Sequence, residues 1–135
     1  MSNATARVLL YSDDRTVRQQ VRLALGSRVS ADTDELEVFD VATEPGVFTA
    51  VREGGIDLII LDAEATPAGG MGVCRGLKDE IADCPPIVLL VARVADAWLA
   101  SWCRAEAVCA YPVDPERLPA AVADLLRAKV AGAAS

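Results

Sequence analysis

The stretch Asp57-Leu58-Ile59-Ile60-Leu61-Asp62 decides the fold class of this chain. Its four consecutive apolar residues predict a strand that is buried on both faces, as in a parallel sheet covered by helices. Asp62 closes this run, at the point where such a strand meets its outgoing loop. Because open α/β sheets bind ligands outside the carboxyl ends of their strands, Asp62 is a candidate for chemistry. The alternative is that Asp62 only starts a turn or caps the next helix.

Apolar runs of the same kind alternate with amphipathic segments along the rest of the chain. Strands are expected over residues 8–11, 36–42, 87–91 and 108–111, and helices over 15–25, 47–52, 73–81, 95–105 and from 114 to about 130. Asp114 is the expected N-cap of the last helix, with Pro115 at its first position. Residues 63–72 carry Pro67 and three glycines and are expected to form an irregular loop.

Five strands alternating with five helices predict an α/β fold, a doubly wound five-stranded parallel sheet of the flavodoxin-like kind with strand order 2-1-3-4-5. The expected domain is single and spans residues 7–131. Residues 1–6 are expected to be a disordered N-terminus, and residues 132–135 a frayed tail.

The composition is that of a folded acidic protein. Of the 135 residues, 53% are hydrophobic and 24% are charged, which excludes a disordered chain. The net charge of −7 argues against binding of nucleic acid or anionic membranes through the general field of the protein. No apolar run approaches the ~20 residues of a membrane span, and no secretory leader is evident, so a cytoplasmic protein is expected.

The chain has no histidine, which removes histidine-dependent catalytic triads and the common zinc sites. Its four cysteines have no metal-ligand spacing, so they are expected to be reduced thiols, mostly in the core.

Acidic residues follow two of the predicted strands. Asp13 and Asp14 end the first strand and Asp62 ends the third, so the order 2-1-3-4-5 would bring them together at the switch point of the sheet. Neighbouring carboxylates repel one another unless a cation lies between them. Mg²⁺ is the natural partner, since it takes one or two carboxylates and keeps several waters.

With these residues in place, the chain resembles the receiver domain of bacterial two-component response regulators, the CheY-like fold, from Arg7 to about Val130. The resemblance is carried by the segments VLLYSDDRTVRQQVRLAL, GGIDLIILDAE, PPIVLLVA and AYPVDPERL. It implies that Asp62 is the phosphoacceptor. It also implies that Asp13, Asp62 and the backbone carbonyl of Glu64 bind Mg²⁺, with Asp14 as an additional or substitute ligand.

The chain departs from the family pattern at the positions that matter for phosphorylation. Ser12 stands where the family usually has its first acid, Val91 matches the hydroxyl residue, Val108 the switch aromatic, and Tyr111 the near-invariant lysine. Loss of the lysine alone could lower phosphoryl occupancy or rate about tenfold to a hundredfold, because a hydrogen bond to a charged group is lost. The resemblance further predicts a cis Tyr111–Pro112 peptide bond.

Two functions within two-component phosphorelay signalling are compatible with this pattern. In the first, the chain is a stand-alone atypical receiver that acts through protein–protein interaction, with weak or no phosphorylation at Asp62 and loosely bound Mg²⁺. In the second, it is a conventionally phosphorylated single-domain response regulator. In both, the expected partner is a histidine kinase or another protein, and an enzyme is not expected.

The alternative from another class is a small flavodoxin-like nucleotide-binding enzyme. Against it, the first strand leads into Ser12-Asp13-Asp14-Arg15 instead of a glycine-rich phosphate loop.

Two tryptophans fall in the expected helix 95–105. At ~100° per residue, Ala95, Leu99 and Trp102 lie in the middle of one face, which predicts that Trp102 covers the sheet. Trp98 falls at the edge of that face and is expected to be partly exposed. It would lie on the surface of the fourth helix, fifth strand and last helix, where a partner or a second copy could dock. No direct contact with nucleic acid and no membrane insertion are expected.

Overall fold

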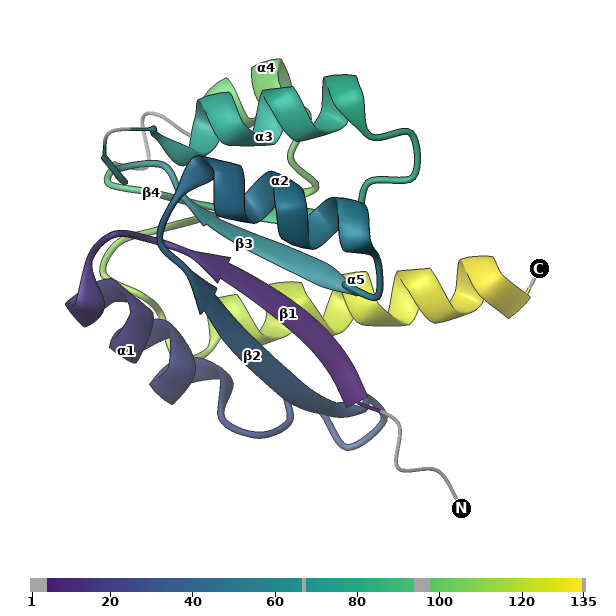
Figure 1. Cartoon of the computed structure of the whole chain (residues 1–135). Helices are drawn as coiled ribbons and strands as arrows, with labels where there is room; N and C mark the ends of the chain where they lie inside the picture. Colours follow the sequence, from purple (N-terminus) through teal and green to yellow (C-terminus); the bar gives the residue numbers. More distant parts are fainter. Residues whose placement is uncertain (1–4, 67, 94–97, 135) are drawn as a thin grey trace.

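A five-stranded parallel sheet with helices on both faces forms the molecule (Figure 1). The computed structural model describes residues 5–66, 68–93 and 98–134. The strand order β2-β1-β3-β4-β5 and the parallel pairing of every neighbouring pair confirm the predicted fold. The elements are β1 (Thr5–Tyr11), α1 (Arg15–Leu25), β2 (Glu35–Val41), α2 (Glu44–Glu53), β3 (Leu58–Asp62), α3 (Gly70–Glu80), β4 (Ile87–Val91), α4 (Leu99–Cys103), β5 (Ala107–Ala110) and α5 (Arg117–Ala134).

The central strand β3 is buried on both faces, as predicted. Leu58 and Ile60 pack into the core under α1 and α5, while Ile59 and Leu61 pack into the core under α2 and α3, and all four side chains are inaccessible to solvent. Figure 1 shows α2, α3 and α4 on one side of the sheet and α1 and α5 on the other. The alternation of successive strand side chains between the two faces therefore gives the protein two core layers.

The ends of several elements differ from the predicted ones. β1 begins at Thr5, because Thr5 and Ala6 continue the ladder with β2, so residues 5 and 6 belong to the sheet and not to a disordered N-terminus. α5 continues through Ala134, past the predicted end near residue 131. Residues 1–4 and 135 lie outside the described residues, and the disorder expected there stays a prediction.

The loop after β3 is shorter than predicted because α3 begins at Gly70. A Cβ atom at position 70 would lie 2.6 Å from the carbonyl oxygen of Asp62, so only glycine lets the helix start this close to the strand end. Glycines that looked like a loop signal in the sequence therefore belong to the first turn of a helix.

The region of the two tryptophans corrects another prediction. The described helix α4 spans only Leu99–Cys103, and Ala95 lies outside the described residues. Trp98 is 70% exposed, in agreement with the prediction of partial exposure, but Trp102 is 51% exposed and does not cover the sheet. The neighbouring Cys103 is the buried residue, and the Trp102 ring stacks on the guanidinium of Arg75 from α3, 4.4 Å from the ring centroid.

The turn from β5 into α5 follows the prediction closely. The Tyr111–Pro112 bond is cis. The Asp114 carboxylate accepts hydrogen bonds from the backbone amides of Glu116 (2.7 Å) and Arg117 (3.0 Å), as an N-cap does, although the helix itself begins at Arg117.

All four cysteines are free thiols, as expected. In the part of the chain that the structure describes, no helix combines the length and the apolar character needed to cross a membrane.

The close approach at Gly70 generates a testable prediction. Gly70→Ala should lower the free energy of unfolding by ~1–3 kcal/mol, because its Cβ would meet the backbone atoms of Asp62 and Ala63. Gly72→Ala is the matched control, since a Cβ there meets nothing within 4 Å, and it should be neutral or stabilising by up to ~1 kcal/mol. Urea unfolding monitored by circular dichroism measures both changes. Equal effects of the two substitutions would contradict this account of the start of α3.

Candidate functional site

The Asp62 carboxylate lies at the carboxyl end of β3 and is 2% exposed. Its Oδ1 accepts hydrogen bonds from the Glu64 backbone amide (2.9 Å) and the Tyr111 hydroxyl. Its Oδ2 accepts one from the Ser12 hydroxyl at 2.7 Å. A carboxylate offers about four lone-pair positions, so three of them are already occupied by groups of the protein itself.

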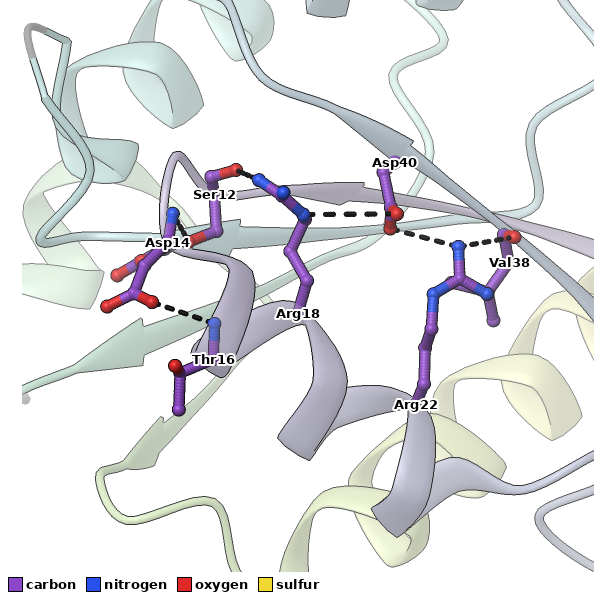
Figure 2. A network of polar contacts seen from close by, with 8 residues as sticks. Ser12, Asp14, Thr16, Arg18, Arg22, Val38 and Asp40 are labelled. Atoms are coloured by element: carbon purple, nitrogen blue, oxygen red, sulfur yellow. Dashed lines mark hydrogen bonds and ion pairs between the residues drawn. The ribbon is translucent and has the colours of Figure 1, made fainter.

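Ser12 is held in place by α1. It is fully buried at the end of β1, where its carbonyl oxygen accepts a hydrogen bond from Arg18 Nη1 (2.7 Å) and its hydroxyl oxygen accepts one from the Asp14 amide (3.0 Å). Figure 2 shows the Arg18 side chain reaching from α1 between Ser12 and Asp40 of β2. Asp40 also pairs with Arg22 at 3.0 Å. These contacts fix the backbone that points the Ser12 hydroxyl at Asp62.

The two acids after β1 point to separate partners. The Asp14 carboxylate caps α1 by accepting a hydrogen bond from the Thr16 amide at 2.8 Å (Figure 2). Asp13 Oδ2 accepts one from the Thr66 hydroxyl at 2.7 Å. This hydrogen bond lowers the pKa of Asp13 from its usual value, so Asp13 is ionised at neutral pH.

The loop after β3 is tied down at two points. Besides the contact of Thr66 with Asp13, the buried Tyr11 hydroxyl donates to the Ala68 carbonyl oxygen at 2.5 Å. The loop is thus fastened at Thr66 and at Ala68 to residues at the end of β1.

Tyr111 brings an uncharged donor to Asp62 from the end of β5. Burial, followed by the hydrogen bond to Asp62 and the Asp62 charge, raises the pKa of Tyr111 well above its usual value. The phenol is therefore protonated at neutral pH and donates to the carboxylate.

These residues line a cavity of about 450 Å³, made by Asp13, Asp14, Arg15, Val17, Asp62, Glu64 and Tyr111. The structure thus brings together the predicted site residues and Tyr111, which stands where receiver domains usually have a lysine. The predicted residues in this cavity are Asp13, Asp14, Asp62 and Glu64. Val91, Val108 and Trp98 do not line this cavity: Val91 is buried at the end of β4, Val108 is half-buried in β5, and Trp98 precedes α4.

The acidic side chains that would hold a magnesium ion already have partners from the protein. Across residues 5–66, 68–93 and 98–134, no group of three or more acidic, cysteine or histidine side chains is arranged to hold a metal ion. Ser12 supplies a hydroxyl where a third carboxylate would stand, and the carboxylates of Asp13 and Asp62 already accept hydrogen bonds. Glu64, whose carbonyl was the predicted third ligand, contributes its amide to Asp62.

Sequence reasoning missed three hydroxyl contacts at this site. The Ser12 hydroxyl, the Thr66 hydroxyl and the Tyr11 hydroxyl bind Asp62, Asp13 and Ala68, respectively. Only Ser12 carried a signal, because it stands in the place of an acid and directly precedes the acidic pair. Thr66 and Tyr11 lie in segments whose tertiary neighbours cannot be read from periodicity.

Comparison with known proteins gives the family. No family model matches the chain. An uncharacterized response regulatory protein of Mycobacterium tuberculosis, found in strains H37Rv and CDC 1551, is 52% identical over 127 residues, covering 94% of this chain and 96% of the relative.

Solved structures agree on the fold. The chemotaxis response regulator CheY4 of Vibrio cholerae superposes with a TM-score of 0.75 at 21% identity, covering 91% of this chain and 100% of that one. The response regulator TrrA from Thermotoga maritima, in complex with Mg²⁺ and BeF, gives 0.72 at 23% identity, covering 90% and 99%. With a relative at 52% identity along nearly its whole length, the chain belongs to the response regulators of two-component signalling, as a receiver domain.

Proposed function

We propose that this chain is an atypical receiver that signals through protein–protein interaction, with weak or no phosphorylation at Asp62. The observation that carries the proposal is the occupation of the buried Asp62 carboxylate by the Ser12 hydroxyl, the Glu64 amide and the Tyr111 hydroxyl.

Phosphoryl transfer to Asp62 requires a carboxylate oxygen in line with the phosphorus, and cations around the three equatorial oxygens. The lysine position is the neutral Tyr111, and the two lysines of the chain are in ion pairs away from the cavity, Lys78 with Glu106 and Lys129 with Asp57. Arg15 is the basic residue that lines the cavity, and it makes no described hydrogen bond with Asp62. The site therefore offers little to balance the charge of a phosphoryl group.

Magnesium binding at Asp13 and Asp62 is expected to be weak for the same reason. An ion there would compete with the Thr66 hydroxyl for Asp13 and with the donors on Asp62. Removal of the ion should consequently leave the fold intact, because each acid keeps a partner from the protein.

The partner is proposed to be a histidine kinase or another protein, and the docking surface is that of α4, β5 and α5. Trp98 exposes 70% of its surface beside α4, and the four β5 residues are all partly accessible. A tryptophan at such a position supplies a large contact area at a small entropic cost. A second copy of the chain could use the same surface.

The first test is direct phosphorylation. With acetyl phosphate and Mg²⁺, intact-mass spectrometry should show only a minor phosphorylated fraction, and Asp62→Asn should remove it. Rapid and near-complete addition of one phosphoryl group that depends on Asp62 would instead establish the alternative, a conventionally phosphorylated response regulator.

The second test concerns Trp98. Trp98→Ala should weaken partner binding or self-association by ~2 kcal/mol or more while leaving the melting temperature nearly unchanged, because the side chain is exposed. Trp102→Ala is the matched control; it loses the cation–π contact with Arg75, which is worth ~0.5–1 kcal/mol at an exposed site. If Trp98→Ala destabilised the fold by ~3–5 kcal/mol, as a core truncation does, Trp98 would be a structural residue and the docking proposal would be wrong.

A further inference from the structure

Tyr111 differs from the other two donors to Asp62 in how it is held. The Glu64 donor is a backbone amide in a turn that is closed by the Ala65 amide on the Asp62 carbonyl oxygen at 3.2 Å. Ser12 is inaccessible to solvent and its backbone is held by Arg18. Tyr111 is half-buried at the end of an edge strand and packs only at the margin of the core, so it is the more accessible of the two side-chain donors.

We infer that Tyr111 closes the receiver site, acting as a built-in ligand of Asp62 that competes with an incoming phosphoryl group or its mimic. This inference rests on the proposed function and names what limits the reactivity of Asp62. Tyr111 is a positioning residue in this role, because it acts on the carboxylate and carries out no chemistry.

The opposite role is one in which the tyrosine replaces the missing lysine as a donor to the phosphoryl group, and the binding experiment below separates the two. A phenol has one hydrogen to donate, and in this structure Tyr111 donates it to Oδ1 of Asp62. Glu64 donates to the same oxygen at 2.9 Å, so both lone-pair positions of Oδ1 are taken. An attack by Oδ1 therefore requires that the tyrosine hydroxyl leave first.

The Tyr111 residue also connects this site to the surface. It lines the cavity at Asp62, and it lines a groove of about 370 Å³ together with Cys109, Ala110, Pro112, Val113, Asp114, Pro115 and Arg117. Displacement of Tyr111 from Asp62 would therefore change a wall of this groove, which lies within the proposed docking surface.

The deciding experiment removes one hydroxyl at a time. Tyr111→Phe deletes the donor to Asp62 and keeps the ring, while Ser30→Ala deletes a hydroxyl that binds another aspartate, Asp32, and does not line the cavity. Titration with beryllofluoride in the presence of Mg²⁺, followed by ¹⁹F NMR, gives the half-saturating concentration for each protein. We expect about a tenfold decrease for Tyr111→Phe, because in the wild type the ligand competes with a hydrogen bond to a charged group, and no change for Ser30→Ala.

A second readout separates this role from a purely structural one. With the tyrosine hydroxyl gone, the Glu64 amide is the remaining donor to Oδ1, so its ¹H–¹⁵N resonance should move before any ligand is added. In Ser30→Ala this resonance should stay in place.

Each outcome bears on a different claim. Weak binding by the wild type with tighter binding by Tyr111→Phe, abolished by adding Asp62→Asn, supports the inference. Weak binding by the wild type with equal or weaker binding by Tyr111→Phe overturns the inference and leaves the proposed function standing. Tight binding and ready phosphorylation of the wild type overturn both. If Tyr111→Phe does not fold, Tyr111→Leu also lacks the hydroxyl and is judged by the same outcomes.

Discussion

The burial of the Asp62 carboxylate is the constraint on which the rest of the site depends. A buried carboxylate without partners costs several kcal/mol or more, so this fold has to supply donors at the end of β3. Parallel strands make this possible, because the ends of β1, β3 and β5 lie at the same edge of the sheet. Ser12, Glu64 and Tyr111 come from these three ends and meet at one side chain.

The neighbouring carboxylates of Asp13 and Asp14 also accept hydrogen bonds from the protein. Asp14 binds the start of α1 and Asp13 binds the loop after β3 through Thr66, so each carboxylate has a donor from the protein. Among the residues that the structure describes, no buried polar side-chain atom lacks a hydrogen-bond partner. These hydrogen bonds hold the acidic side chains in one arrangement, which is the arrangement that the proposed function requires.

The sequence predicted the sheet well because burial on both faces leaves a continuous apolar run, as in Leu58 to Leu61. It predicted the start of α3 poorly, because Gly70 is required by a contact with the Asp62 carbonyl and looks like a loop signal without it. Trp102 was placed on the sheet by periodicity, yet the stacking partner Arg75 comes from another helix. Asp13, Asp14 and Asp62 were predicted from their positions after strands, and Glu64 and Tyr111 from the resemblance to receiver domains. Their hydroxyl partners depend on tertiary packing that no local pattern records.

Val91 and Val108 stand where receiver domains usually have a hydroxyl residue and an aromatic residue. Their aliphatic side chains limit how a change at Asp62 could reach the surface of α4, β5 and α5. Val91 is buried in the core layer under α2 and α3, and Val108 packs against the same layer, so neither can form a polar contact with Asp62. Among the described contacts, Tyr111 is the polar side chain that touches Asp62 and also lines the groove beside β5 and α5. A change at Asp62 would therefore reach this surface through the position of one aromatic ring, and a partner seated in the groove would act on Asp62 through the same ring, since coupling between two sites is reciprocal.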